Sequence, residues 1–139
     1  MDSAHNTVEL NAALSNPRDD IAKLDELEKK LFAFNYAANE IGSFGPCIDP
    51  KKAAEERGEA LAILGEQIQE TLCDPAVGAL LDRLHENRAL LDETHRAQVK
   101  ILRRDRSQLV DVPVELQSNF VRLTTETNEV WEQAKNSDD

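Results

Sequence analysis

The chain has 139 residues, enough for one domain with a buried core. Charged residues make up 31% of the sequence and hydrophobic residues 40%, a balance typical of globular rather than disordered proteins. The formal charge of −11 argues against nucleic acids and anionic membranes as main partners, because their phosphates would be repelled. Glycine, proline and aromatic residues are few, which favours helices over sheets.

Residues 1–18 form a polar flank, in which one short helical turn is expected around residues 8–14. The flank lacks the basic start and apolar run of a signal peptide, and no stretch of the sequence approaches membrane-spanning length. Cys47 and Cys73 are far apart and form no Cys-x-x-Cys motif, which favours free thiols. These features predict a cytoplasmic protein.

Residues 19–139 are expected to form one helical domain. The break at Pro17, followed by Asp19 or Asp20 as the N-cap, predicts a first long helix with an apolar stripe up to residue 38. A loop is expected over residues 42–50, which are rich in glycine and proline. Aspartate followed by proline, at residues 49–50 and again at 74–75, marks the starts of a second and a third helix.

In the second helix, Gly58, Ala62 and Gly65 predict a face that another helix approaches closely. A fourth helix is expected to run from residue 91 or 92 to about Val110, before the break at Val112–Pro113. The last helix alternates apolar residues at spacings of four and three, which predicts that this stripe packs against long antiparallel neighbours. The stripe comprises Leu116, Phe120, Leu123, Thr127, Val130 and Ala134. The predicted fold class is therefore all-α, a bundle of about five helices, largely antiparallel.

The three histidines, His5, His85 and His95, are candidate metal ligands, but the residues around them do not have the spacing of known metal-binding motifs. The segment beginning at His85 has Ala89 where a zinc-binding helix needs its second histidine. The pairs at residues 82 and 85 and at 92 and 95 have Asp-x-x-His spacing, but di-iron bundles normally use glutamate and further glutamates from other helices. His95 lies on an apolar face, which predicts a core histidine with satisfied hydrogen bonds.

Other polar residues also have an ordinary structural interpretation. Cys47 lies before a helix N-terminus but has no partnered histidine, so it is expected to be a plain thiol. The pairs Glu66/Glu70 and Glu126/Glu129 are expected on solvated faces. The basic run 100–106 is expected to pair with acidic neighbours, and Trp131 lies either at the edge of the core or on a contact surface. We therefore assign no catalytic, cofactor-binding or metal-binding residue.

Arg57 is an exception on the apolar stripe of the second helix. It is in line with Leu61 and Leu64, where a guanidinium needs a partner. We expect that partner to be an Asp or Glu from a neighbouring helix.

Four stretches resemble the N-terminal helical region of the carboxypeptidase Taq family of zinc metallocarboxypeptidases. They are the opening helix over 24–37, the segment 50–61 with its Pro start, Arg57 and Glu59, the Arg-Arg-Asp run 103–105 followed by Val-Pro-x-Glu-Leu at 112–116, and Trp-x-x-Ala-Lys at 131–135. Their order covers about residues 20–135. The loop at 43–47 departs from the family pattern, which typically has a Trp-Asp-x-x-Thr-like segment there.

The resemblance implies a non-catalytic wall or lid domain of a larger enzyme that removes C-terminal residues from peptides. The family's His-Glu-x-x-His motif is absent from this sequence, so zinc is expected only in the parent enzyme and whether this chain is an enzyme by itself is left open. Its partners would be the remainder of the parent peptidase and, in the parent, the peptide substrate. The alternative is a stand-alone helical protein-interaction domain, a truncated paralogue, and self-association fits both.

Overall fold

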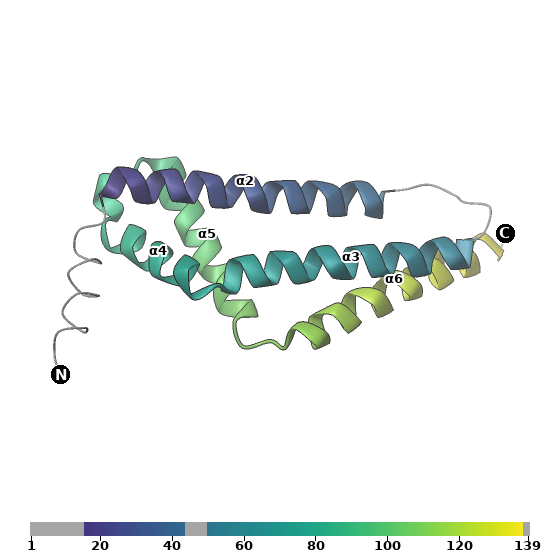
Figure 1. The fold of residues 1–139 in the computed structure, drawn as a ribbon. Coiled ribbons are helices and arrows are strands. Elements are labelled where there is room, and N and C mark those ends of the chain that lie inside the picture. The colour runs from purple at the N-terminus through teal and green to yellow at the C-terminus, as the bar shows by residue number, and fades with distance from the viewer. Residues whose placement is uncertain (1–15, 44–49, 138–139) are drawn as a thin grey trace, which may run out of the picture.

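The computed structural model describes residues 16–43 and 50–137, and in these ranges it contains five α-helices, one short 3-10 helix and no strand (Figure 1). The helices are α2 (Pro17–Gly42), α3 (Pro50–Cys73), α4 (Pro75–Glu86), α5 (Glu93–Leu109) and α6 (Val114–Ser137), with the 3-10 helix η1 (Arg88–Leu90) between α4 and α5. The all-α prediction is confirmed. No helix in the described part of the chain is both long and apolar enough to cross a membrane.

The starts of the helices follow local capping chemistry. Asp74 accepts a hydrogen bond from the Ala76 amide at 2.8 Å, and Asp92 accepts one from the His95 amide at 2.9 Å. The start of α2 differs from the prediction, because Pro17 is the first helical residue and Asn16, rather than Asp19 or Asp20, is the cap. A proline at this position loses no hydrogen bond, so it begins the helix instead of ending the flank.

Two other expectations about the flank and loop fall on residues outside the described ranges. These are the short turn around residues 8–14 and the Asp49 cap. At the other end of the chain, α6 continues to Ser137 where fraying was expected from residue 136.

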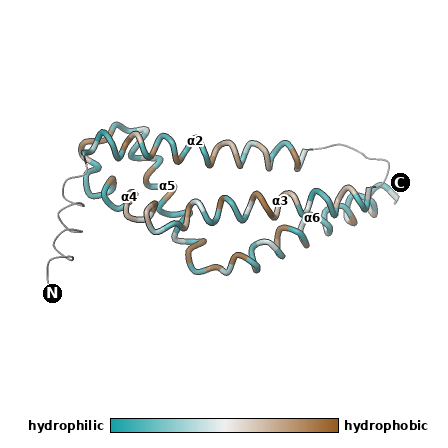
Figure 2. The backbone as a smooth tube through the Cα atoms, viewed as in Figure 1, coloured by the Kyte–Doolittle hydropathy of each residue, from teal (hydrophilic) through white to brown (hydrophobic). Residues whose placement is uncertain are grey.

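Three long helices lie along one another, with α3 between α2 and α6 (Figure 1). The chain direction alternates through α2, α3 and α6, as expected for a largely antiparallel bundle. The shorter helices α4 and α5 gather at the end where α2 begins and α3 ends. In Figure 2, hydrophobic and hydrophilic segments alternate along α2, α3 and α6, which is the pattern of helices that bury one side only.

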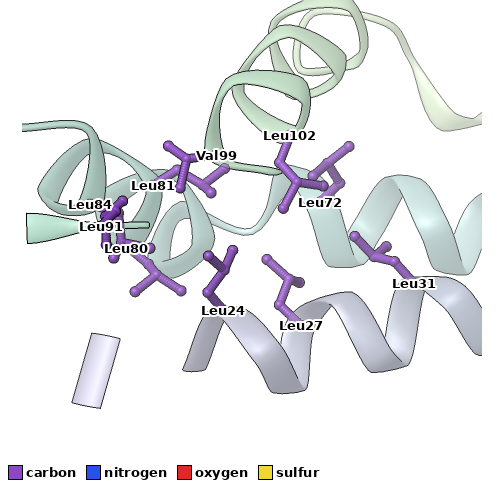
Figure 3. Close-up of a cluster of buried hydrophobic side chains, with 10 residues drawn as sticks. All are labelled: Leu24, Leu27, Leu31, Leu72, Leu80, Leu81, Leu84, Leu91, Val99 and Leu102. Atoms are coloured by element: carbon purple, nitrogen blue, oxygen red, sulfur yellow. The ribbon is translucent and has the colours of Figure 1, made fainter. Parts of the chain in front are cut away.

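The hydrophobic core lies at the end formed by α4 and α5 (Figure 3). Its ten members come from α2, the end of α3, α4, the residue that follows η1, and α5: Leu24, Leu27, Leu31, Leu72, Leu80, Leu81, Leu84, Leu91, Val99 and Leu102. The buried face of α4 carries Leu80, Leu81 and Leu84, and that of α5 carries Val99 and Leu102. None of these core residues belongs to α6, so α6 is held by other means.

A buried ion pair closes the edge of this core. Asp20 on α2 is 2% exposed and accepts hydrogen bonds from the Arg83 Nε and Nη2 atoms of α4 at 3.1 and 3.0 Å. Two parallel hydrogen bonds fix the guanidinium and the carboxylate relative to each other. Hydrogen bonding to Asp20, helped by its negative charge, outweighs burial and raises the pKa of Arg83 further. The pair ties the first turn of α2 to α4.

Two long polar side chains fix the junctions between helices. Gln69 of α3 donates to the carbonyls of Leu109 and Val112 at 3.3 and 2.6 Å, which holds the turn between α5 and α6. Arg106 donates to the carbonyls of Leu72 and Asp74 at 2.6 and 2.9 Å, where α3 ends. The Leu72 carbonyl lies in the last turn of α3, where carbonyls lack a partner within their own helix, so a cationic donor is well placed there. The Asp74 carbonyl also accepts hydrogen bonds from the Val77 and Gly78 amides of α4, so Arg106 links the end of α3 to the start of α4.

The contact between α3 and α6 uses small residues. Ala54 and Ala62 are buried on α3, and a Cβ added at Gly58 would lie 3.5 Å from Thr125 Cβ and 3.6 Å from the Arg122 backbone. The predicted close approach at Gly58 and Ala62 is confirmed. The prediction for Gly65 is wrong, since a Cβ there would meet nothing within 4 Å. The contacting row is therefore 54, 58 and 62, one residue every four along the helix.

The apolar stripe of α6 faces away from α3, contrary to the prediction that it packs inside the bundle. Leu116, Phe120, Leu123 and Val130 are 61%, 64%, 64% and 66% exposed. The opposite side of α6 is the one that packs, with Ser118 only 2% exposed. The physical reason is that the small residues of α3 leave room for the polar and small side chains of α6. Residues of α3 also supply hydrogen-bond partners for these polar side chains.

We expect Leu81→Ala to lower the free energy of unfolding by about 2–5 kcal/mol, because Leu81 is 1% exposed and its loss leaves a cavity. Leu90→Ala is the matched control, since Leu90 is 66% exposed and should change stability by less than about 0.5 kcal/mol. Urea unfolding followed by circular dichroism measures both. Equal losses in the two variants would contradict the assignment of the core.

Candidate functional site

Arg57 belongs to the segment 50–61, which resembles the carboxypeptidase Taq family, and it lies where α3 meets α6. Its Nη2 atom lies 3.2 Å from Glu129 Oε2 of α6, and both side chains are about one-fifth exposed. The expectation that a carboxylate from a neighbouring helix pairs with Arg57 is confirmed. Two grooves of about 310 Å³ and 200 Å³ adjoin this pair, and Glu129 lines both. The pair therefore forms a polar centre on the surface where α3 meets α6.

Further polar contacts continue this α3–α6 interface. Arg122 donates to both carboxylate oxygens of Glu59, at 2.7 and 3.1 Å, and Ser118 donates to Glu66. The hydrogen bond from Arg122 lowers the pKa of Glu59 despite some loss of solvation. These contacts favour an ionised Glu59 at neutral pH.

The interpretation of the two carboxylate pairs needs a correction. Glu70 and Glu126 are exposed, as expected for solvated faces. Glu66 and Glu129 are instead half-buried in the α3–α6 interface, where each has a partner. Helical spacing alone does not show that one member of such a pair turns toward a neighbouring helix.

His95 forms a second polar cluster, between α2 and α5. Its Nδ1 atom lies 2.9 Å from Asp92 and its Nε2 atom lies 3.2 Å from Asp25. The expectation that its hydrogen bonds are satisfied is confirmed, but the ring lies at the edge of the core, with the side chain 22% exposed. Partial burial opposes protonation, yet the hydrogen bonds to Asp92 and Asp25 outweigh it and raise the pKa of His95.

Neighbouring groups in this cluster shift the pKa values of two carboxylates, Asp92 and Glu28. Hydrogen bonds from the backbone and the ring of His95 lower the pKa of Asp92. Partial burial, followed by the nearby charge of Asp25, raises the pKa of Glu28, which accepts a hydrogen bond from Gln98. The cluster is thus a link between helices in which one imidazole faces two carboxylates, and its strength depends on the protonation of His95.

The other predicted positions have structural partners. Arg103 pairs with Asp82 at 3.2 Å and Arg104 with Asp105 at 2.9 Å, which confirms acidic partners for the basic run. Burial raises the pKa of the Cys73 thiol, only partly opposed by the nearby charge of Arg106, so this thiol is a weak nucleophile. Cys47 and most of the 43–47 loop lie outside the described residues.

The structure joins the two side chains of one Asp-x-x-His pair, at residues 92 and 95, by a hydrogen bond. Asp82 is engaged by Arg103 rather than by His85. Both ring nitrogens of His95 are occupied by carboxylates, so neither is directed at a shared metal ion. No group of three or more His, Cys, Asp or Glu residues with the arrangement of a metal site occurs in the described part of the chain.

Two structural interactions have no signal in the sequence pattern. The Asp20–Arg83 ion pair joins positions 63 apart, and Gln69 donates to carbonyls that are 40 and 43 residues away. Asp20 looked like a helix cap because it follows Pro17 closely. Gln69 carried no signal except its place beside an apolar stripe.

Comparison with known proteins identifies the class to which this helical chain belongs. The family model described as carboxypeptidase Taq (M32) metallopeptidase matches residues 46–139. No curated protein and no solved structure matches. The chain belongs to the carboxypeptidase Taq family. The match contains Arg57, Glu129 and the whole of α3 to α6, and it begins inside the loop after α2.

Family membership implies zinc chemistry, but the His, Cys, Asp and Glu residues in the described part of the chain do not have the arrangement of a zinc site. Catalytic zinc needs three protein ligands and an open position for water. The histidine at residue 95 is hydrogen-bonded through both nitrogens, and the described residues offer no cluster of three donors. No catalytic step is therefore derived through zinc on these residues.

His95→Gln should lower stability by less than about 1 kcal/mol at acidic pH, and by less still at alkaline pH. The pKa of His95 is raised above its usual 6.5 in the folded state. Its ionic contribution is therefore fully present below the unfolded-state pKa and is lost as the pH rises through the folded-state pKa.

Urea unfolding of the wild type and of His95→Gln, from acidic to alkaline pH, measures the difference in the free energy of unfolding. Asp25→Asn, introduced into both proteins, isolates the contact between α2 and α5. A difference in stability that grows with pH would contradict the assigned partners.

Proposed function

We propose that residues 19–139 form a non-catalytic wall or lid of a carboxypeptidase Taq-type enzyme that removes C-terminal residues from peptides. The observation that carries this proposal is the family match over residues 46–139. In this proposal the zinc ion and its water belong to the rest of the parent enzyme, which supplies the hydrolytic chemistry. The helices described here contribute position, shape and charge.

The architecture supports a wall. Helices α2, α3 and α6 run side by side as a long layer, and the hydrophobic core lies at one end of it (Figure 1). The remainder of the layer is fastened by ion pairs between helices, including Arg57–Glu129 and Arg122–Glu59. A rigid layer beside a reaction centre excludes water and restricts which peptides enter.

The α3–α6 grooves give the wall a polar surface. Carboxylates outnumber cations in their lining, with Glu55, Glu126, Glu129 and Glu132 against Lys51 and Arg57. Such a surface favours peptides with a basic side chain near the bound end and disfavours acidic ones.

A second candidate function is a stand-alone helical interaction domain. The observation that favours it is the row of exposed apolar side chains on α6, together with Phe32 and Tyr36 on α2, which are 69% and 58% exposed. Exposed apolar surface of this extent marks contact with another protein surface.

The purified chain should release no C-terminal residue from peptides, either with added zinc or after chelation. Mass spectrometry of the peptide products measures this, with an established zinc carboxypeptidase as the positive control. Hydrolysis that depends on zinc and is lost on chelation would show that the chain is itself catalytic. Sequencing the reading frame past the Asp139 codon separates the two candidates, since the wall requires a downstream His-Glu-x-x-His segment and the stand-alone domain a stop codon.

A further inference from the structure

A cleft of about 520 Å³ lies between α4 and α5, and its polar lining is mostly cationic. Three arginines of α5 line it, and Asp82 of α4 is the one acidic residue among the described residues of its lining. Apart from one serine, the rest of the lining is small or apolar. We define this arginine cleft by its eight residues: Gly78, Leu81, Asp82, Arg103, Arg104, Arg106, Ser107 and Val110.

The arginine cleft concentrates positive charge in an acidic chain. Helix α5 has five Lys or Arg residues and two Asp or Glu residues, whereas the whole chain has 16 and 27. At physiological ionic strength a charge is screened beyond about 8 Å, so a small ligand in the cleft responds to the arginines more than to distant carboxylates. The local charge therefore favours an anionic ligand, although the formal charge of the chain is −11.

Arg106 is held in place by one of its nitrogens and keeps two others for a ligand. Its Nη1 atom donates to the carbonyls of Leu72 and Asp74 at 2.6 and 2.9 Å. Its Nε and Nη2 atoms donate to no protein group in the described part of the chain, and neither atom is buried from solvent. These two nitrogens form the fork that can hold both oxygens of one carboxylate. Arg106 is therefore a fixed cation with an open bidentate edge.

Gly78 of α4 makes room for this guanidinium. A Cβ built at Gly78 would lie 2.8 Å from Nη2 and 2.9 Å from Nε of Arg106, which is closer than such atoms approach in proteins. The two nitrogens of the fork therefore lie against the backbone of α4, at a residue that lines the cleft. A glycine inside a helix lowers its stability relative to alanine, and the contact with Arg106 gives a physical reason for a glycine here.

Arg103 and Arg104 have partners that an incoming carboxylate can replace. Arg103 Nη2 lies 3.2 Å from Asp82 Oδ1, in a pair whose side chains are 38% and 66% exposed. Arg104 lies 2.9 Å from Asp105, the next residue of the same helix, and its side chain is 65% exposed. Exposed ion pairs are weak, because water and salt screen them. Exchanging one carboxylate for another therefore costs little here, and both guanidiniums keep further donors for a ligand.

We propose that the arginine cleft binds an acidic segment of another protein. One carboxylate of the segment binds the fork of Arg106, and others bind Arg103 and Arg104. Val110 is 47% exposed at the cleft and gives the segment an apolar contact beside its carboxylates. The ligand class is thus a short run of Asp and Glu that includes one apolar residue, a mode of recognition typical of arginine clusters. The site goes beyond the proposed wall function and does not depend on it.

A short acidic segment fits the cleft better than a phosphate polymer or a membrane. A segment of a few residues touches only the cleft, where three arginines face one aspartate. A nucleic acid or an anionic membrane extends past the cleft and meets the carboxylates that give the chain its negative charge. The observations therefore favour a protein ligand.

Fluorescence anisotropy with a labelled acidic peptide tests the site in the purified chain. The probe is Gly-Glu-Glu-Leu-Glu-Glu-Gly, and its control has Gln in place of each Glu. We expect saturable binding of the acidic probe that weakens several-fold between about 50 and about 300 mM salt, and no binding of the control. No binding of the probe at the lower salt concentration, or equal binding of the control, would overturn the proposal.

Charge reversal at Arg104 tests where the probe binds. Arg104→Glu should raise the dissociation constant of the probe about tenfold with unchanged helicity, because this side chain is exposed and contacts no other helix. Lys135→Glu makes the same change of charge near the end of α6, far from α4 (Figure 1), and should change the constant less than about twofold. Equal losses in the two variants would indicate general charge attraction and overturn the site.

Removal of the acidic residue in the cleft should have the opposite effect. Asp82→Asn frees Arg103 from its partner on α4 and should lower the dissociation constant of the probe about threefold. Glu132→Gln removes one negative charge from an exposed position on α6 and is the matched control. An effect of Asp82→Asn no larger than that of Glu132→Gln would contradict binding at Arg103.

A labelled oligothymidine with as many negative charges as the peptide distinguishes the two classes of ligand in the same assay. We expect it to bind more weakly than the acidic peptide at equal salt, because carboxylates match the arginine forks and a longer phosphate chain meets acidic surface. Tighter binding of the oligothymidine would overturn the assignment of a protein ligand.

Discussion

The row of small residues on α3 is the constraint on which the rest of the arrangement depends. Ala54, Gly58 and Ala62 let the backbone of α6 approach closely, and a larger side chain in this row would push α6 away. Close approach then brings the Arg57–Glu129 and Glu59–Arg122 partners within reach. Because this side of α6 is the one that packs, its apolar side faces outward. The small size of the residues in this row thus determines both the polar contact between α3 and α6 and the outward direction of the apolar stripe of α6.

Two kinds of interaction hold different parts of the molecule together. Leucine burial stabilises the end where α4 and α5 lie, while hydrogen bonds and ion pairs hold α6 along α3. Exposed ion pairs contribute little each, so the α3–α6 part is expected to be the less stable one.

Sequence patterns predicted the helices well because capping chemistry and apolar periodicity act locally. Asp74 caps α4 as the Asp-Pro sequence indicated, and Arg57 pairs with a carboxylate from a neighbouring helix, as its partial burial requires. The orientation of α6 was not predictable in this way. Its strongest periodic signal lies on the exposed side of the helix, and periodicity does not show whether an apolar stripe faces into the bundle or outward. Contacts such as Gln69 with the α5–α6 turn depend on tertiary packing and leave no local signal.

The most direct test of this account compares Gly58→Leu with Gly65→Leu by urea unfolding. Both changes replace a glycine in α3 and add the same helix propensity, up to about 1 kcal/mol. A Cβ at Gly58 would already touch α6, whereas one at Gly65 would meet nothing within 4 Å. We expect Gly58→Leu to lower the free energy of unfolding by about 1–3 kcal/mol through overpacking, and Gly65→Leu to leave it equal or higher. Equal stability of the two variants would contradict the close packing of α6 on Gly58, and with it the outward direction of the apolar stripe of α6.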